Sequence, residues 1–150
     1  MKGLQLNIKN LQKNTEFDTK VISEIDDEGP TNRIKWIEHK KIPILFADYS
    51  NFENPEQTIK TIQRVTNYII KLGYKEILML IDVRNSFADE KKVVDTLKNA
   101  SKETKPYLRK VAVVGVTSTQ EFILKIINMF SGLGIKSFET FDDAKEWLVE

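Results

Sequence analysis

The sequence contains an uninterrupted run of five apolar residues at positions 77–81, which ends in Asp82 and leads into a polar segment. A run this short and this rich in branched side chains is typical of a strand buried on both faces. A buried helix is the alternative, but Gly73 before the run and Asn85 and Ser86 after it leave too little room for one. In parallel sheets, sites form where the carboxyl ends of strands meet the following loops. We therefore expect any functional chemistry near Asp82.

Two further apolar runs, at 42–47 and 111–116, predict buried strands, and a short fourth strand is expected at 135–138. Segments with helical periodicity follow each strand. These helices are expected between Asn54 as a cap and Gly73, from Ser86 or Asp89 to Lys105, over 119–131, and from the cap Thr140 onward. Four successive strand–helix units imply right-handed crossovers and a mainly parallel sheet.

The first 40 residues have a different pattern. Alternating apolar residues at 4–8 predict a half-buried strand, and similar alternation at 20–25 and 33–38 flanks a segment dense in turn formers. These two stretches predict an antiparallel hairpin. The expected fold class is therefore α/β, with a mainly parallel four- to five-stranded sheet, flanking helices and an N-terminal antiparallel hairpin. We expect one domain over 1–150, with N-terminal strands in 1–40 and a βα core in 42–149.

Composition excludes several classes of function. The 150 residues include 23 basic and 22 acidic side chains, so the charge of +1 gives no electrostatic footprint for nucleic acid. The sequence has no cysteine, which excludes thiolate chemistry. Its single histidine has no partners for a serine–histidine hydrolase or a histidine metal cluster. No Gly-rich phosphate loop follows any predicted strand. No signal peptide or apolar run of about 20 residues is present, which predicts a cytoplasmic protein without a transmembrane segment. We expect no catalytic residue, metal or cofactor.

Polar and aromatic residues follow three of the predicted strands and should meet at one rim of the sheet. Helix N-termini there favour anions, although the same residue types also serve as caps and turn formers. Phe52 and Phe87 are aromatics on polar loops, and they would either anchor a partner or fold back onto the core. The candidate partner- or ligand-binding residues are Asp48, Tyr49, Phe52, Asp82, Asn85, Ser86, Phe87, Thr117 and Ser118.

Several of these segments resemble the SpoIIAA-like family of small bacterial proteins. They are ILFADYS at 44–50, LIDV at 80–83, AVVGVT at 112–117 and FETFDDAKEWL at 138–148. Members are similar in fold to STAS domains and to CRAL-TRIO lipid-binding domains. The resemblance covers about two-thirds of the chain and implies a four- or five-stranded sheet with flanking helices, without enzyme activity.

In STAS regulators of this type, a phosphorylatable serine begins the helix after a central strand, in an Asp-Ser-Ser/Thr-Gly motif. The resemblance places Ser86 at that position, within the segment 85–89. The neighbouring Ser/Thr and the glycine are absent, and Asp89 would repel a phosphate group on Ser86. Both differences argue against a phosphoswitch at Ser86.

Three hypotheses about function follow. The first is a non-enzymatic STAS-like regulatory module that binds a protein partner or a second copy of itself. The second is a carrier of a small amphipathic, lipid-like ligand, suggested by the wide apolar face of the helix at 119–131 together with Met79, Met129 and Phe130. The third is an enzyme that uses Asp48 and Asp82 with a metal ion.

Overall fold

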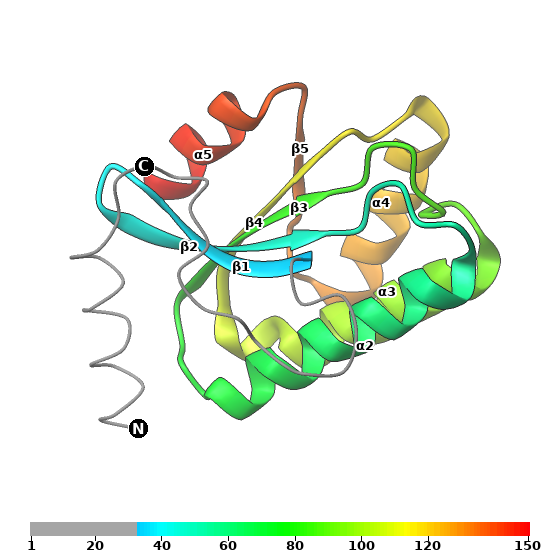
Figure 1. Ribbon diagram of the computed structural model, residues 1–150, viewed down its shortest axis with the longest axis horizontal. Helices are drawn as coiled ribbons and strands as arrows, with labels where there is room; N and C mark the ends of the chain where they lie inside the picture. Colours follow the sequence, from blue (N-terminus) through cyan, green and yellow to red (C-terminus); the bar gives the residue numbers. More distant parts are fainter. Residues whose placement is uncertain (1–32) are drawn as a thin grey trace.

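The computed structural model describes residues 33–150, so the predicted strands at 4–8 and 20–25 lie outside the described residues. Figure 1 shows the arrangement of the elements. The strands are β1 (Ile34–His39), β2 (Ile42–Asp48), β3 (Ile77–Asp82), β4 (Leu108–Val114) and β5 (Lys136–Phe138). The helices are α2 (Pro55–Leu72), α3 (Lys91–Thr104), α4 (Ser118–Ser131) and α5 (Phe141–Val149), with a single 3₁₀ turn, η2 (Lys105–Tyr107).

The five strands form one sheet in the order β1-β2-β3-β4-β5. Strands β2 to β5 are parallel, and β1 is antiparallel to β2. This confirms the predicted fold class and places β3 at the centre of the sheet. Strand β1 also forms a hairpin with β2 through a two-residue turn, Lys40 and Lys41, both at positive φ. That turn lacks the Asn-Gly or Asp-Gly signal that identifies such hairpins in a sequence. The predicted pairing of 33–38 with 20–25 involves residues outside the described part of the chain and stays a prediction.

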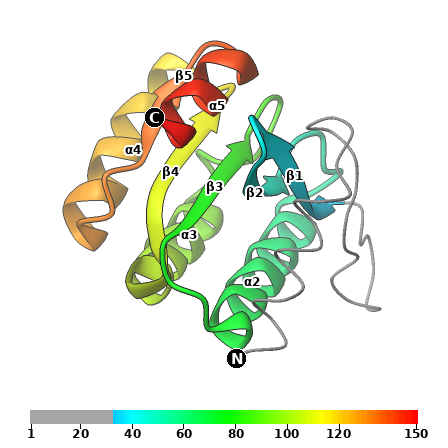
Figure 2. The same cartoon turned by 90° about the vertical axis from the view of Figure 1, so that its left-hand side faces the viewer.

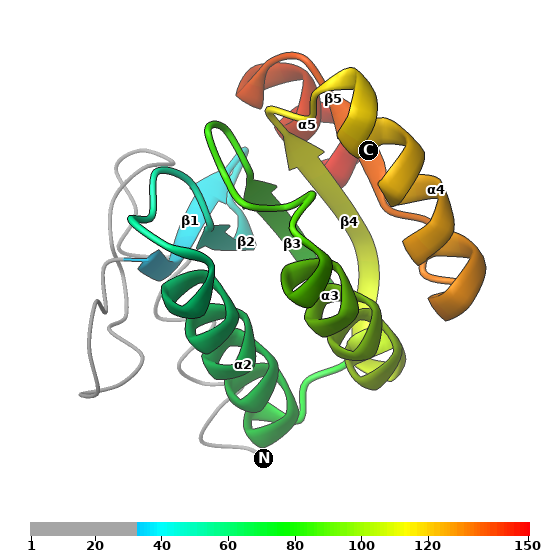
Figure 3. The ribbon, with the colours of Figure 1, turned by 90° about the vertical axis from the view of Figure 1, so that its right-hand side faces the viewer.

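Helices α2, α3 and α4 lie on one face of the sheet and α5 lies on the other (Figures 2 and 3). Because the parallel strands follow one another in one direction, right-handed crossovers place the three connecting helices on the same face. Side chains alternate along β3 accordingly. Ile77 and Met79 join the core under α2 to α4, whereas Leu78 and Leu80 join the core under α5. The central strand is therefore buried on both faces, as the apolar run predicted.

The helix boundaries reflect local capping. Asn54 Oδ1 accepts a hydrogen bond from the Gln57 N–H at 2.9 Å, and Gly73 ends α2 in the left-handed conformation, as predicted. The predicted start of α3 is wrong. The helix begins at Lys91, and the Glu90 side chain caps it by accepting from the Lys92 N–H. The segment from Ser86 to Asp89 therefore forms a turn before the helix.

The single histidine helps to hold α5 against β1. His39 Nε2 lies 2.6 Å from Glu146 Oε2, and Lys40 donates to the other oxygen of that carboxylate at 2.8 Å. Hydrogen bonds from Lys40 and His39 lower the pKa of Glu146. His39 thus has a structural role at the end of a strand.

Candidate functional site

Asp48 and Asp82 lie side by side at the carboxyl edge of the sheet. They are register partners on the neighbouring parallel strands β2 and β3, so their side chains leave the sheet on the same face. The two carboxylates therefore lie at one rim of the sheet, as the strand pattern predicted. Each carboxylate has its own arginine: Arg33 lies 3.4 Å from Asp48, and Arg84 lies 2.9 Å from Asp82.

Asp82 organises the loop that follows β3. Its side chain is only 3% exposed, and it accepts hydrogen bonds from the Arg84 backbone N–H, from Nε and from Nη2. The same hydrogen bonds raise the pKa of the Arg84 guanidinium, and the charge of Asp82 adds to the effect. The Arg84 guanidinium also lies over the Phe141 ring, 4.8 Å from its centroid. The carboxylate is thus bonded within its own loop.

Asp48 has an equivalent role after β2. One of its oxygens accepts from the Ser50 backbone N–H at 2.9 Å and from the Ser50 hydroxyl at 2.5 Å. Arg33 donates to the Ser50 carbonyl oxygen and stacks on the Phe52 ring at 4.0 Å. Tyr49 is buried in the core, and burial raises the pKa of its hydroxyl.

The two rim loops are bonded to each other. The Tyr49 N–H donates to the Asp82 carbonyl oxygen at 2.9 Å, and the Asn51 N–H donates to the Asn85 carbonyl oxygen at 3.1 Å. Phe52 and Phe87 are partly buried and pack against the core. Of the two expected arrangements, these aromatics therefore adopt the one in which they fold back onto the core. The hydrogen bonds of Asp48 and Asp82 and the packing of Phe52 and Phe87 are all contacts within the chain. The role of these residues in binding stays a prediction.

Gly115 and Arg84 make a close backbone approach at the same rim. Gly115 has φ +96°, and a Cβ built there would lie 2.7 Å from the Arg84 backbone nitrogen. The glycine follows β4 directly, and it lets this loop pass against the loop that carries Arg84. Neither Gly115 nor the arginines were among the predicted site residues. The signal that the sequence offers for such a turn is the strand-end aspartate, whose side chain can accept from the backbone N–H two residues further on.

Ser86 and the residues at the start of α4 serve the local backbone. Ser86 Oγ accepts from the Ala88 N–H at 3.2 Å. Thr117 and Gln120 form a reciprocal capping box, and Ser118 is the exposed first residue of the helix. Because α3 begins at Lys91, Ser86 does not occupy the helix N-terminus where the family resemblance placed a switch.

Replacing Thr117 by alanine should lower the free energy of unfolding by about 1 kcal/mol, because the Gln120 N–H loses its acceptor. Chemical denaturation measures this loss. Thr119→Ala is the matched control, since Thr119 is an exposed residue one position further into the helix from Ser118. That variant should change stability by no more than about 0.5 kcal/mol. Equal losses in the two variants would contradict the capping role.

The three residues of the ligand-carrier hypothesis are not brought together. Met79 is buried under α2 to α4, whereas Met129 is 86% exposed and Phe130 is 44% exposed. An apolar cavity of about 70 Å³ does lie between α3, α4 and the sheet. Its walls include Ile81, Leu97 and Ile127. This volume is well below the roughly 300–1,000 Å³ of pockets that enclose drug-sized ligands.

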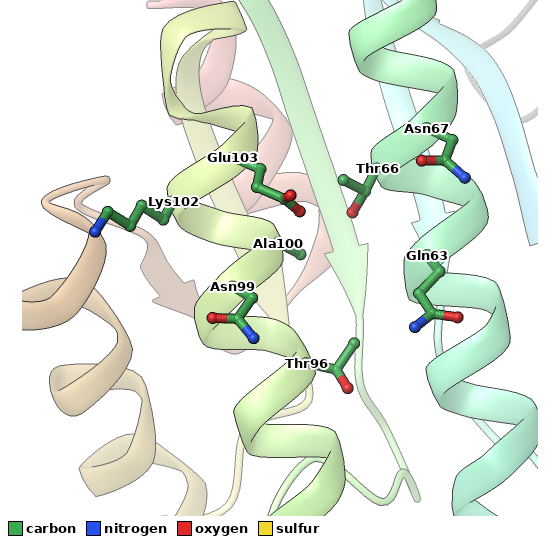
Figure 4. A pocket seen from close by; sticks show the side chains of 8 residues that line it. All are labelled: Gln63, Thr66, Asn67, Thr96, Asn99, Ala100, Lys102 and Glu103. Atoms are coloured by element: carbon green, nitrogen blue, oxygen red, sulfur yellow. The ribbon is translucent and has the colours of Figure 1, made fainter.

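A larger groove of about 550 Å³ runs between α2 and α3 (Figure 4). Its walls are mainly amides and hydroxyls, with Gln63 and Asn67 on α2 and Asn99 on α3. The hydroxyls of Thr66 and Thr96 donate to carbonyl oxygens of their own helices. Lys102 points away from the groove, toward α4. The groove is therefore open, with a lining of mixed polar and apolar surface.

Residues 33–150 offer neither a metal-binding cluster nor a membrane-spanning helix. This part of the chain holds no group of three or more His, Asp or Glu side chains that could bind a metal ion. None of its helices combines the length and the apolar character needed to cross a membrane.

Helix α4 is apolar on two sides. Its inner side packs on the core through Leu124 and Ile127. Of the five large apolar side chains that are exposed within residues 33–150, four belong to α4. They are Phe122 at 66%, Ile126 at 39%, Met129 at 86% and Phe130 at 44% exposure. We call these four residues the α4 stripe. The apolar width of this helix was predicted, but its exposure was not.

These features define a class: a small α/β domain with β3 at its centre and an exposed apolar face on helix α4. The loops at the carboxyl edge of its sheet are hydrogen-bonded to each other. Within that class the chain belongs to the SpoIIAA-like family, whose model matches residues 17–149. This confirms the resemblance seen in the sequence. At the level of the family, membership supports a regulatory or interaction module. No curated protein and no solved structure matches the chain significantly.

Proposed function

We propose that this chain is a non-enzymatic regulatory or protein-interaction module that docks onto its partner through the α4 stripe. The observation that carries the proposal is the exposure of Phe122, Ile126, Met129 and Phe130 on one side of a helix whose opposite side is already in the core. A helix that is apolar around most of its circumference is normally buried on every side. In this structure, the outward side is open.

The size of the α4 stripe is adequate for a docking surface. With roughly 150–250 Å² for a large apolar side chain, the exposed fractions correspond to about 450 Å². Apolar patches of this size on monomeric proteins are commonly functional. At about 25 cal/mol per Å², covering the patch contributes roughly 10 kcal/mol before the entropic costs of association. At the rim, by contrast, the side chains of Asp48, Asp82 and Thr117 already accept hydrogen bonds within the protein.

The double variant Phe122→Gln/Met129→Gln tests this function. We expect it to leave the free energy of unfolding within about 1 kcal/mol of the wild type, because both side chains are largely exposed. In size-exclusion chromatography of gently prepared extracts from the native host, the wild type should elute in a complex and the variant should elute alone. Lys60→Gln, an exposed change on α2, is the matched control and should keep the complex.

A variant that retains the complex would contradict docking through the α4 stripe. A large loss of stability in the double variant would assign the stripe to the core. For comparison, Ile127→Ala on the inner side of α4 should lose about 2–4 kcal/mol, because Ile127 is 4% exposed.

A further inference from the structure

We infer that the partner segment that fits the α4 stripe is an acidic amphipathic helix of another protein. The inference rests on the proposed function and names the chemistry of its partner. Phe122, Ile126 and Met129 are spaced four and then three residues apart, the seam spacing by which one helix packs along another. A helix with a matching apolar seam would cover all three side chains.

The charges beside the seam select the partner. Lys98 Nζ and Lys102 Nζ on α3 lie 4.7 and 5.2 Å from the centroid of the Phe130 ring. Lys105 adds a third ammonium group at this end, since a Cβ placed on Gly132 would lie 2.7 Å from its Nζ. Lys125 is exposed on α4 itself. Charges that flank an apolar helix seam set partner choice, so carboxylates on the incoming helix should face this basic end.

The other end of the α4 stripe has a different charge. Glu121 is exposed near Phe122 and accepts a hydrogen bond from the Ser137 hydroxyl at 2.7 Å. On α3, Asp95 is paired with Lys91 at 3.2 Å. The basic charge is therefore concentrated at the Phe130 end. A uniformly anionic lipid surface would attract that end but meet the carboxylate of Glu121 at the other, whereas a protein helix can place its carboxylates at one end only.

A second copy of the chain is a poorer fit. The seam residues Phe122 and Met129 lie on either side of Ile126, so the two-fold axis of an antiparallel pairing of two seams passes near Ile126. The adjacent Lys125 would then approach Lys125 of the other copy. Two lysines brought together at an interface centre repel each other, which argues against an antiparallel homodimer through this face.

A designed helical peptide probes the inference on the full-length protein. The peptide carries a leucine seam flanked by glutamate at one end, and two matched peptides carry glutamine or lysine at the same positions. Fluorescence anisotropy gives the Kd of each. We expect the glutamate peptide to bind about tenfold or more tightly than the lysine peptide, with the difference shrinking at high salt. Lys98→Glu/Lys102→Glu should reverse the preference, and Phe122→Gln/Met129→Gln should abolish binding of every peptide.

The outcomes separate this inference from the function on which it rests. Equal binding of the glutamine and glutamate peptides, still lost in the Phe122→Gln/Met129→Gln variant, would overturn the acidic partner and keep the α4 stripe as the docking surface. Binding that this variant does not reduce would overturn both. Retention on vesicles of phosphatidylserine and phosphatidylcholine without peptide binding would identify a membrane instead. A dimer mass by light scattering that Met129→Gln abolishes would identify a second copy.

Discussion

Replacing Gly115 by alanine is expected to lower the free energy of unfolding by about 3 kcal/mol. The residue has φ +96°, a region that residues with a Cβ rarely occupy. The new methyl group would lie 2.3 Å from Arg84 Cγ and 2.7 Å from the Arg84 backbone nitrogen, so the loop after β3 would have to shift. Strain at the glycine and overpacking against a backbone add together. Chemical denaturation of the purified variant measures the loss.

Gly134→Ala is the matched control for this prediction. Gly134 also has a positive φ, +74°, but a Cβ built there has no atom within 4 Å. Its cost should therefore be the conformational penalty alone, about 1 kcal/mol. Similar losses at the two positions would show that contact with Arg84 contributes nothing.

Replacing Asp82 by alanine is expected to cost about 2–3 kcal/mol. The carboxylate is buried at the end of the central strand and accepts from the Arg84 backbone N–H and from its guanidinium. Removing it leaves that N–H without its acceptor and opens a small cavity. Because the Arg84 side chain is 56% exposed, solvent screens part of the ionic contribution.

A double-mutant cycle of Asp82→Ala with Arg84→Met separates the contribution of the Asp82–Arg84 side-chain ion pair from that of the hydrogen bond between Asp82 and the Arg84 backbone N–H. We expect a coupling of about 1 kcal/mol between the two side chains, with the remaining loss at Asp82 independent of the arginine. If Asp82→Ala left stability unchanged, Asp82 would not be the organiser of this loop, and a binding role for the carboxylate would regain its basis.

The sheet could be predicted because local and global signals agree in it. The apolar runs before Asp48 and Asp82 form strands that are buried on both faces of the sheet, so the sequence pattern and the packing agree. Asn54 and Gly73 mark the two ends of α2 because capping depends only on residues within one helical turn. The start of α3 was mispredicted because Ser86 and Asp89 have the spacing of a capping box, while the cap that forms is the Glu90 side chain.

The rim and the α4 stripe show what a sequence pattern leaves open. It predicts that Asp48 and Asp82 share an edge, but not that Arg33 and Arg84 lie beside them, since those contacts depend on how loops cross. In the same way, apolar positions along α4 predict burial, whereas Phe122 and Met129 are exposed because only one side of the helix meets the sheet. Exposure is set by which neighbouring elements exist, and periodicity does not report that.

We propose that partners dock on the α4 stripe and not on the rim. The chain has no cysteine, so single-cysteine variants carry one photo-crosslinker at a chosen site. Met129→Cys samples the α4 stripe, Ser118→Cys the rim and Lys60→Cys the surface of α2, all at exposed positions. We predict a discrete crosslinked product from Met129→Cys in the native host that the added change Phe122→Gln removes. A discrete product from Ser118→Cys, with none from Met129→Cys, would contradict the account.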